Sequence, residues 1–249
     1  MKADLIPSTK ASPEWILDLL VIVSRRTNDI EAMKKAIHEY LLKKSIRGKR
    51  NERNSVYAIA FPTLGRLGLK EGKGNKVRLS KDGKILLNAS KRGIEEYKRV
   101  FAKIIYKVDS GKAHVLEGLL QLGKKVVSTE ELVVQLRKIG VATNQDDDRL
   151  KKWLRFLDYV DFVSSRNGSY YVNIPQILAI EKGGAEVEFS DFLSVFVEQY
   201  NTLRKMSRGN IYVKIPDLEK KVQDALVGRD FTTFDFRKYL KRLKGYSNK

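Results

Sequence analysis

Two short stretches with turn-forming residues interrupt a chain whose apolar residues otherwise recur at helical spacing. The first covers residues 67–79, and its tip residues are expected to take positive φ: Gly72, Gly74 and Asn75. The second covers residues 162–172 and turns at Asn167-Gly168, a pair typical of two-residue hairpins. Helices followed by a hairpin, twice in one chain, predict a mainly α fold with small β-hairpins (α+β) and a repeated plan.

Three helical segments precede the first hairpin. The first starts at Ser12-Pro13, where Ser12 is expected to cap the free amides and proline suits the first helical position. Ile30–Lys43 and Val56–Leu67 are expected to form the second and third. Pro62 lies near the middle of the third, so a kink or a break is expected there.

The segment LGRLGLKEGKGNKVRLSKDGKILL, residues 64–87, resembles the recognition-helix end and wing of winged-helix DNA-binding proteins. In that family a leucine-rich helix leads to Gly-Leu or Gly-Ile, a basic turn and an LT-x-x-G-x-x-L exit. Ser80 stands here in place of the usual threonine. The resemblance implies a winged-helix module over residues 1–92, with a linking helix over residues 93–109 after it.

Residues 110–176 repeat this plan and are expected to form a second winged-helix module. A helix is expected from Lys112 to Leu122, and Ser128 with Glu131 forms a capping-box pattern ahead of the next helix. A third helix is expected from Thr143 to Val160, before the second hairpin.

Residues 177–249 are expected to form a helical module, interpreted as a truncated winged helix. The pattern predicts helices over Ser190–Lys205, Asp217–Leu226 and Phe231–Leu243, with Thr232 or Thr233 as the last cap. A short strand is expected over residues 211–215.

Tandem winged helices joined by linking helices are similar in plan to the DNA-recognition portion of type IIS restriction endonucleases, over about residues 12–176. In those proteins a separate nuclease domain cuts the DNA. The likeness implies target recognition in a restriction or defence system, with a nuclease or another protein as a partner.

Positive charge is concentrated in the first part of the chain. The formal net charge is +19, and residues 1–108 hold 25 Lys/Arg and 11 Asp/Glu, a net charge of +14. Residues 109–176 have a net charge of +1, and residues 177–249 have +4. Such a field attracts a polyanion, and double-stranded DNA is the expected partner.

The most basic stretch, residues 43–53, lies before the third helix and is expected to contact phosphates and base edges. Arginine can pair with guanine and asparagine with adenine. The contact candidates in and beside this stretch are Lys44, Arg47, Lys49, Arg50, Asn51, Arg53 and Asn54. In the hairpin they are Lys73, Lys76 and Arg78. A solvated basic loop and an ordinary solvated hairpin are the alternatives.

Further candidates lie in the later modules. In the second they are Asn144, Gln145, Arg149, Lys152 and Arg166. Asp146, Asp147 and Asp148 repel phosphate there, so packing against the first module or a partner is the favoured alternative. Arg237 and Lys241 are the candidates in the last part, where a solvated helix face is the alternative. Trp15 and Trp153 are expected in the core.

No catalytic site, metal site or cofactor is predicted. The chain has no cysteine and only two histidines, so few thiol or imidazole side chains could bind a metal or form a catalytic relay. Glu71-Gly72-Lys73 and Glu219-Lys220-Lys221 match part of a nuclease pattern, but such matches arise by chance in a Lys/Glu-rich chain. Without a signal peptide or a membrane-length apolar run, a cytoplasmic location, associated with the nucleoid in a prokaryote, is expected, with no membrane partner.

The leading hypothesis is sequence-specific duplex binding by a non-enzymatic protein, as a transcription regulator or as part of a restriction system. An architectural or replication-linked binder with little sequence preference is the first alternative. A winged-helix protein-interaction scaffold is the second. A homodimer is a further arrangement to consider.

Overall fold

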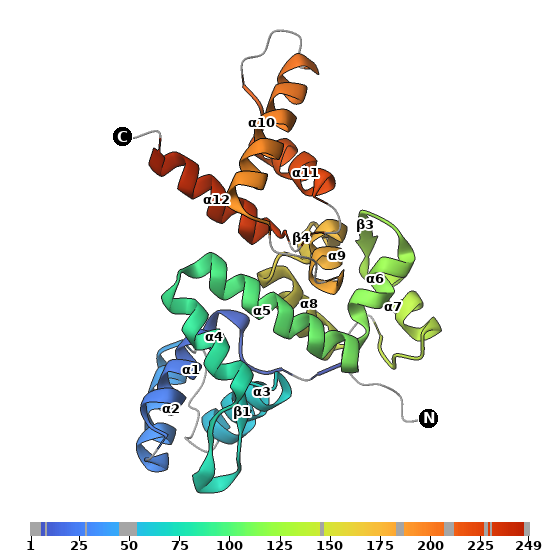
Figure 1. The fold of residues 1–249 in the computed structure, drawn as a ribbon. Coiled ribbons are helices and arrows are strands. Elements are labelled where there is room, and N and C mark those ends of the chain that lie inside the picture. The colour runs from blue at the N-terminus through green and yellow to red at the C-terminus, as the bar shows by residue number, and fades with distance from the viewer. Residues whose placement is uncertain are drawn as a thin grey trace. The chain divides into compact units, whose positions relative to one another are not determined.

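The computed structural model describes residues 6–7, 9–27, 29–44, 54–144, 147–182, 187–206, 212–226, 229 and 231–246. Its contacts divide the chain into two compact units, Met1–Val172 and Asn173–Lys249. The described residues form twelve α-helices and two small antiparallel sheets (Figure 1). The mainly helical α+β composition expected from the sequence is therefore confirmed. None of the described helices is long and apolar enough to cross a membrane.

The first unit opens with two helices packed against each other. A 3₁₀ turn, Pro13–Trp15, leads into α1, Ile16–Arg25, and α2 covers Ile30–Lys44. Helix α1 buries one stripe of side chains, as its spacing predicted: Ile16, Leu19, Leu20 and Val23. Two expectations were wrong. Ser12 was expected to cap the helix, but its side chain makes no cap hydrogen bond, and Trp15 was expected in the core but is only half-buried.

The third helical segment changes type at its proline. Residues Asn54–Ala60 form a π-helix, and α3, Phe61–Arg66, follows with Pro62 in its first turn. Proline has no N–H to donate, so it is tolerated in a first turn but not in the middle of a continuous helix. The break expected at Pro62 is thus present as a change from π to α geometry.

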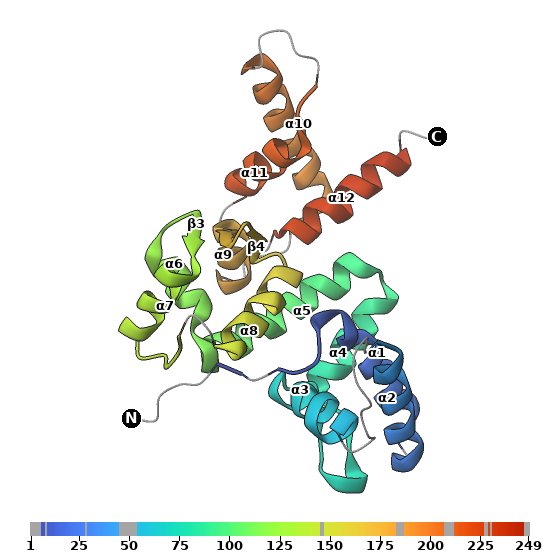
Figure 2. The ribbon, with the colours of Figure 1, turned by 180° about the vertical axis from the view of Figure 1, so that it is seen from behind.

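A small hairpin follows α3, and a serine joins it to the next helix. Strand β1, Lys70–Glu71, pairs with β2, Arg78–Leu79; β1 lies beside α3 (Figures 1 and 2), and β2 contacts α1 and α4. Gly72 and Gly74 have the expected positive φ of 79° and 55°, and Asn75 lies within a 3₁₀ turn, Gly74–Lys76. Helix α4, Lys81–Lys91, starts at Ser80, whose Oγ donates to Gly68 O at 2.6 Å and accepts the Gly83 N–H at 3.0 Å.

Gly83 brings α4 against the hairpin. A Cβ at this position would lie 2.1 Å from Leu69 O, so no other residue fits there without a shift of the backbone. The glycine of the family's exit pattern therefore has a packing reason in this chain. Helix α5, Ile94–Val108, follows within the linking segment expected over residues 93–109, whose first and last residues are its caps.

A buried carboxylate joins α5 to the elements after it. Asp109 opens a π-helical turn, Asp109–Ala113, and its carboxylate accepts hydrogen bonds from Trp153 Nε1 at 2.6 Å and from Leu116 N at 2.9 Å. Burial raises the pKa of Asp109 to about 6. His114, with φ of 53°, separates this turn from α6, Val115–Leu122, so the expected start of that helix at Lys112 was wrong.

The elements after α6 build a three-stranded sheet. Strand β3, Val126–Ser128, leads into α7, Thr129–Lys138, and the capping box of Ser128 and Glu131 is confirmed, with both hydrogen bonds present. Helix α8, Asp148–Tyr159, is followed by β4, Val163–Arg166, and β5, Ser169–Val172. The strand order is β3-β5-β4, and the β4–β5 turn has positive φ at Asn167 and Gly168, as predicted.

Helix α8 starts later than the sequence suggested. Its cap is Asp147, whose carboxylate accepts the Arg149 N–H at 2.8 Å, and residues 143 and 144 lie outside the helix. An aspartate is a good acceptor of amide hydrogen bonds at a helix cap, so the expected start of this helix at Thr143 was wrong.

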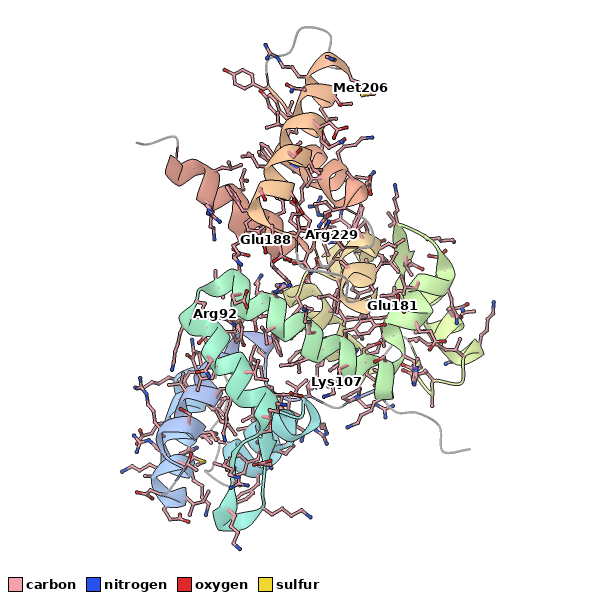
Figure 3. The ribbon with its side chains drawn as sticks, in the orientation of Figure 1. Arg92, Lys107, Glu181, Glu188, Met206 and Arg229 are labelled. Atoms are coloured by element: carbon pink, nitrogen blue, oxygen red, sulfur yellow. The ribbon has the colours of Figure 1, made fainter. Side chains whose placement is uncertain are left out.

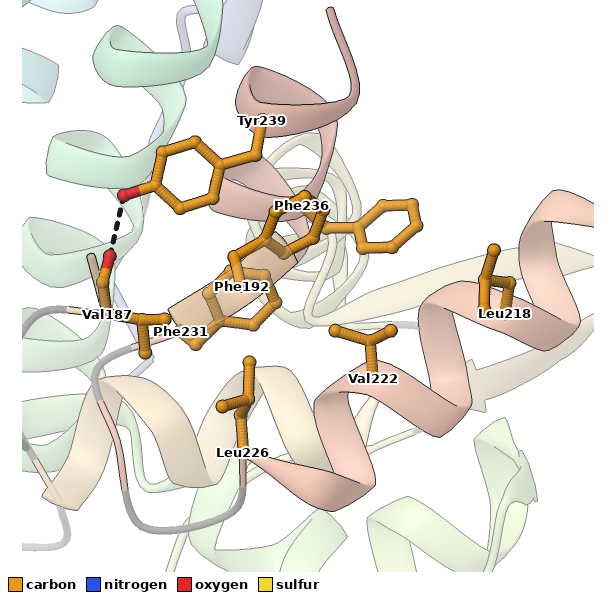
Figure 4. Close-up of a cluster of buried hydrophobic side chains, with 8 residues drawn as sticks. All are labelled: Val187, Phe192, Leu218, Val222, Leu226, Phe231, Phe236 and Tyr239. Carbon is orange, nitrogen blue, oxygen red and sulfur yellow. Dashed lines mark hydrogen bonds between the residues drawn. The ribbon is translucent and has the colours of Figure 1, made fainter. Parts of the chain in front are cut away.

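The second unit consists of helices only, within its described residues. They are α9, Ile174–Lys182; α10, Phe189–Met206; α11, Ile215–Ala225; and α12, Thr233–Tyr246. Their core is rich in aromatic side chains around Phe192, and Tyr239 Oη donates to Val187 O at 2.6 Å (Figure 4). Helix α9 was not predicted. The strand expected over residues 211–215 was wrong, because residues 212–214 are irregular and Ile215 begins α11.

Candidate nucleic-acid interface

The most basic stretch falls largely outside the described residues. Its candidates Arg47, Lys49, Arg50, Asn51 and Arg53 all do so, and so does the side chain of Asn54, the first residue of the π-helix. Lys44 ends α2 on the exposed surface, with its ammonium 5.7 Å from the centre of the Tyr40 ring.

An exposed tyrosine follows that stretch on the π-helix. The Tyr57 side chain is 48% exposed, and its ring meets Phe61 edge-on at 5.8 Å between centroids. The ammonium of Lys34 lies 5.8 Å from the Tyr57 ring, and that of Lys70 lies 5.7 Å from the Phe61 ring. Burial, and then the charge of Lys73, lower the pKa of Lys70. Aromatic and cationic groups thus share one surface, and the sequence analysis did not single out Tyr57.

The hairpin presents its lysines to solvent. Lys73 and Lys76 are exposed on either side of the tip, and no described carboxylate pairs with them. A Cβ at Gly72 would lie 1.9 Å from Lys76 O, so the tight turn requires glycine. Arg78 is exposed as well, but its Nε donates to Glu71 Oε1 at 2.7 Å across the two strands.

Two adjoining cavities lie along one side of this hairpin. The larger, about 520 Å³, is lined by Thr27, the turn and Arg78, and the smaller, about 350 Å³, is lined by Thr27, Arg78 and one face of α4. Lys84 and Lys91 come from α4. We call this surface the α4 groove; it is lined by Ser24, Thr27, Glu71, Gly72, Lys76, Val77, Arg78, Leu79, Lys84, Leu87, Asn88 and Lys91.

Sequence reasoning missed Lys84 and Lys91 as candidate site residues. The available signal was their separation of seven positions on a helix whose other face buries Leu86 and Ala89. Seven residues are close to two turns, so both lysines lie on one exposed face.

The candidates in and before α8 are engaged by nearby acids. The Arg149 guanidinium binds Asp147 through two donors, Nε at 3.0 Å and Nη2 at 2.7 Å, and lowers the pKa of that carboxyl. Lys152 pairs with Asp148 at 3.3 Å. Asn144 is exposed ahead of the helix, and Gln145 is outside the described residues.

The remaining candidates lie on the second hairpin and in the second unit. Arg166 is exposed on β4, with its guanidinium 5.6 Å from the Tyr171 ring. On α12, Arg237 is half-buried and Lys241 is exposed. Their neighbour Arg242 lies 4.1 Å from the Phe189 ring, so part of this basic helix packs against its own unit.

Comparison with known proteins gives no match: no family model, no curated protein and no solved structure is similar to this chain. Among the described residues, no three or more acids or histidines are grouped so that they could hold a metal ion. The site is therefore interpreted from its own charges and geometry.

Proposed function

We propose that the first unit contains two tandem winged-helix modules and binds double-stranded DNA in a sequence-specific manner, chiefly through the first of them. The observation that carries this proposal is the net charge of +14 within residues 1–108. It is supported by the exposed lysines of the hairpin, which no described carboxylate neutralises. A surface of this kind gains affinity by releasing the counterions condensed on a duplex.

The order of elements supports the winged-helix assignment. Helices α1, α2 and the π-helix with α3 precede β1–β2, and α6, β3, α7 and α8 precede β4–β5. In such modules the N-terminal part of the third helix contacts base edges in the major groove. Residues 43–53 precede that position in the first module, and exposed Tyr57 lies within it. A transcription regulator and the target-recognition part of a restriction system are the roles that fit.

Selection of bound duplexes from a randomised DNA library at about 150 mM salt tests sequence specificity. We expect an enriched motif several base pairs long, which Arg50→Ala or Arg53→Ala relaxes at individual positions. Tight, salt-sensitive binding without a motif would instead favour an architectural or replication-linked binder. Absence of duplex binding would refute the proposal.

A second function, protein contact, is favoured for the second module by its paired charges. Asp147 and Asp148 engage Arg149 and Lys152, which leaves less free positive charge for phosphates. The outer face of its sheet also exposes Val126 and Tyr171, which are paired across β3 and β5. Variants of the second module in the full chain test this separation, because they should weaken DNA binding far less than the same changes in the first module.

A further inference from the structure

The lysines that line the α4 groove are not paired with any described acid. No described carboxylate pairs with Lys76, Lys84 or Lys91, and the one acid in the lining, Glu71, is held by Arg78. Two cations on or near α4 that do not line the groove are paired with acids instead. Lys107 pairs with Asp82 at 3.2 Å, and Arg92, at the turn between α4 and α5 (Figure 3), pairs with Glu96 at 3.0 Å.

The spacing of the groove's lysines suits a chain of phosphates. Lys84 and Lys91 are seven residues apart on α4, which places them about 10 Å apart along the helix axis. Asn88 lies on the same face between them, and Ser24 adds a hydroxyl group from α1. The Thr27 hydroxyl also lines the groove but already donates to Val23 O at 3.0 Å. Charged donors at intervals, with neutral donors between them, match an extended polyanion better than they match a single small anion.

The lining also indicates which part of a nucleic acid the groove would hold. Its apolar members, Val77, Leu79 and Leu87, are aliphatic, and no aromatic side chain is among its described lining residues. Binding of unpaired bases relies on aromatic stacking platforms. The composition therefore favours the sugar–phosphate backbone of a base-paired duplex.

We propose that the α4 groove binds a stretch of duplex DNA backbone, so that the hairpin is contacted along its side as well as at its tip. This inference rests on the proposed DNA binding and extends it to a surface outside the third helix. Lys84 and Lys91 each neutralise a phosphate, and Asn88 and Ser24 donate hydrogen bonds to the same backbone.

Affinity measurements across a salt series test the groove directly. The double variant Lys84→Gln/Lys91→Gln is compared with the full-length protein on a 30-base-pair duplex, or about three helical turns. Loss of two phosphate contacts is expected to weaken binding about 30-fold at about 150 mM salt and to reduce the salt exponent by about 1.8. Both lysines are exposed, so the fold should be retained, and a thermal unfolding curve checks this.

The matched control removes the same charge elsewhere in the first unit. Lys125→Gln/Lys138→Gln changes two exposed lysines and should weaken binding less than about threefold. Equal losses of affinity in both variants would contradict DNA binding by the groove, because the change in net charge alone would then explain them. Unchanged binding by the groove variant would also contradict the role of the groove but would leave the proposed function intact. If the native chain bound no duplex, the proposed function itself would be refuted.

Cleavage of the DNA backbone by a reagent attached to the protein independently locates the groove on a bound duplex. The chain has no cysteine, so Lys84→Cys provides a single attachment point for a DNA-cleaving iron chelate. We expect cuts confined to a few neighbouring sugars of a bound duplex carrying the selected motif. The same reagent at Lys138→Cys should give no localised cuts, and an equal pattern from both positions would contradict the proposal.

Discussion

Two groups of elements in the first unit have a similar order but very different surfaces. The first group, residues 13–79, has 15 Lys/Arg and 7 Asp/Glu, and its hairpin lysines are unpaired by any described acid. The second group, residues 115–172, has 9 and 8, and Asp147 and Asp148 engage cations beside them at α8. A helix–hairpin plan alone therefore does not determine the charge of a surface, which depends on how many cations and acids it carries and on which of them pair.

The interiors of the two groups differ as well. In the second group Trp153 reaches the buried carboxylate of Asp109, at the end of α5. The described part of the first group buries no carboxylate. Four experiments can test these contrasts.

The largest effect is expected from the basic stretch of the first group. Replacing Arg47, Lys49, Arg50 and Arg53 by glutamine should weaken duplex binding about 500-fold at about 150 mM salt, since each phosphate contact is worth about fivefold there. The matched variant replaces Arg149, Lys152, Arg155 and Arg166 and should lose less than about tenfold. Binding constants from fluorescence anisotropy decide between them, and similar losses would remove the distinction between the groups.

The next largest effect concerns the buried carboxylate. Because burial raises the pKa of folded Asp109 to about 6, its contribution to stability is greatest below about pH 4 and is lost as the pH rises to about 6. The difference amounts to about 3 kcal/mol. Urea unfolding between pH 4 and pH 7 should show this loss in the native chain and not in Asp109→Asn. Parallel pH profiles for the two proteins would contradict the assignment.

The caps of α7 and α4 are expected to differ in strength by the one additional hydrogen bond that Ser80 makes. Ser128→Ala removes the cap of α7 and should lower the free energy of unfolding by about 1 kcal/mol. Ser80→Ala removes the cap of α4 together with the bond to Gly68 O, so its cost should exceed that of Ser128→Ala by about 0.5–1 kcal/mol. Threonine at either position keeps a hydroxyl and serves as the control. Equal costs for the two alanine variants would show that the bond to Gly68 adds nothing.

The smallest effect is expected where acids and cations already pair. Asp147→Asn/Asp148→Asn releases Arg149 and Lys152, while asparagine remains a good cap for α8. If the second group stands apart from the DNA, affinity should change less than about twofold. A gain of about tenfold in the same binding assay would place α8 against the duplex.

Local patterns in the sequence predicted much of the fold. The apolar stripe of α1, the Asn167-Gly168 turn and the capping box at Ser128 depend on neighbours a few residues away, and each was found as expected. Three features that depend on more distant contacts were not foreseen. The π-helix has the apolar composition of an ordinary helix, β3 is only three residues long and needs β5 as its partner, and α9 was not recognised at all.

The candidate site was less predictable than the fold. Charge alone identified Lys73 and Lys76, but it gave no indication that Glu71 would bind Arg78 or that Asp147 would bind Arg149. Such pairs depend on side-chain positions that the order of residues does not fix. Lys84 and Lys91 became candidates only when α4 was seen to line the same cavity as the hairpin.

The close approach of Gly83 to Leu69 O has a mechanical consequence for the α4 groove. With no room for even a methyl group between them, and with Ser80 bonded to both sides, the hairpin and α4 can move only together. The two sides of the groove that the hairpin and α4 form therefore keep a fixed position relative to each other. A duplex that enters the groove has to supply the adjustment by bending or by changing the width of its own grooves, and stiff and pliable sequences would differ in the energy this takes. The contact between Gly83 and Leu69 O would in this way let the protein discriminate between DNA sequences without contacting their bases.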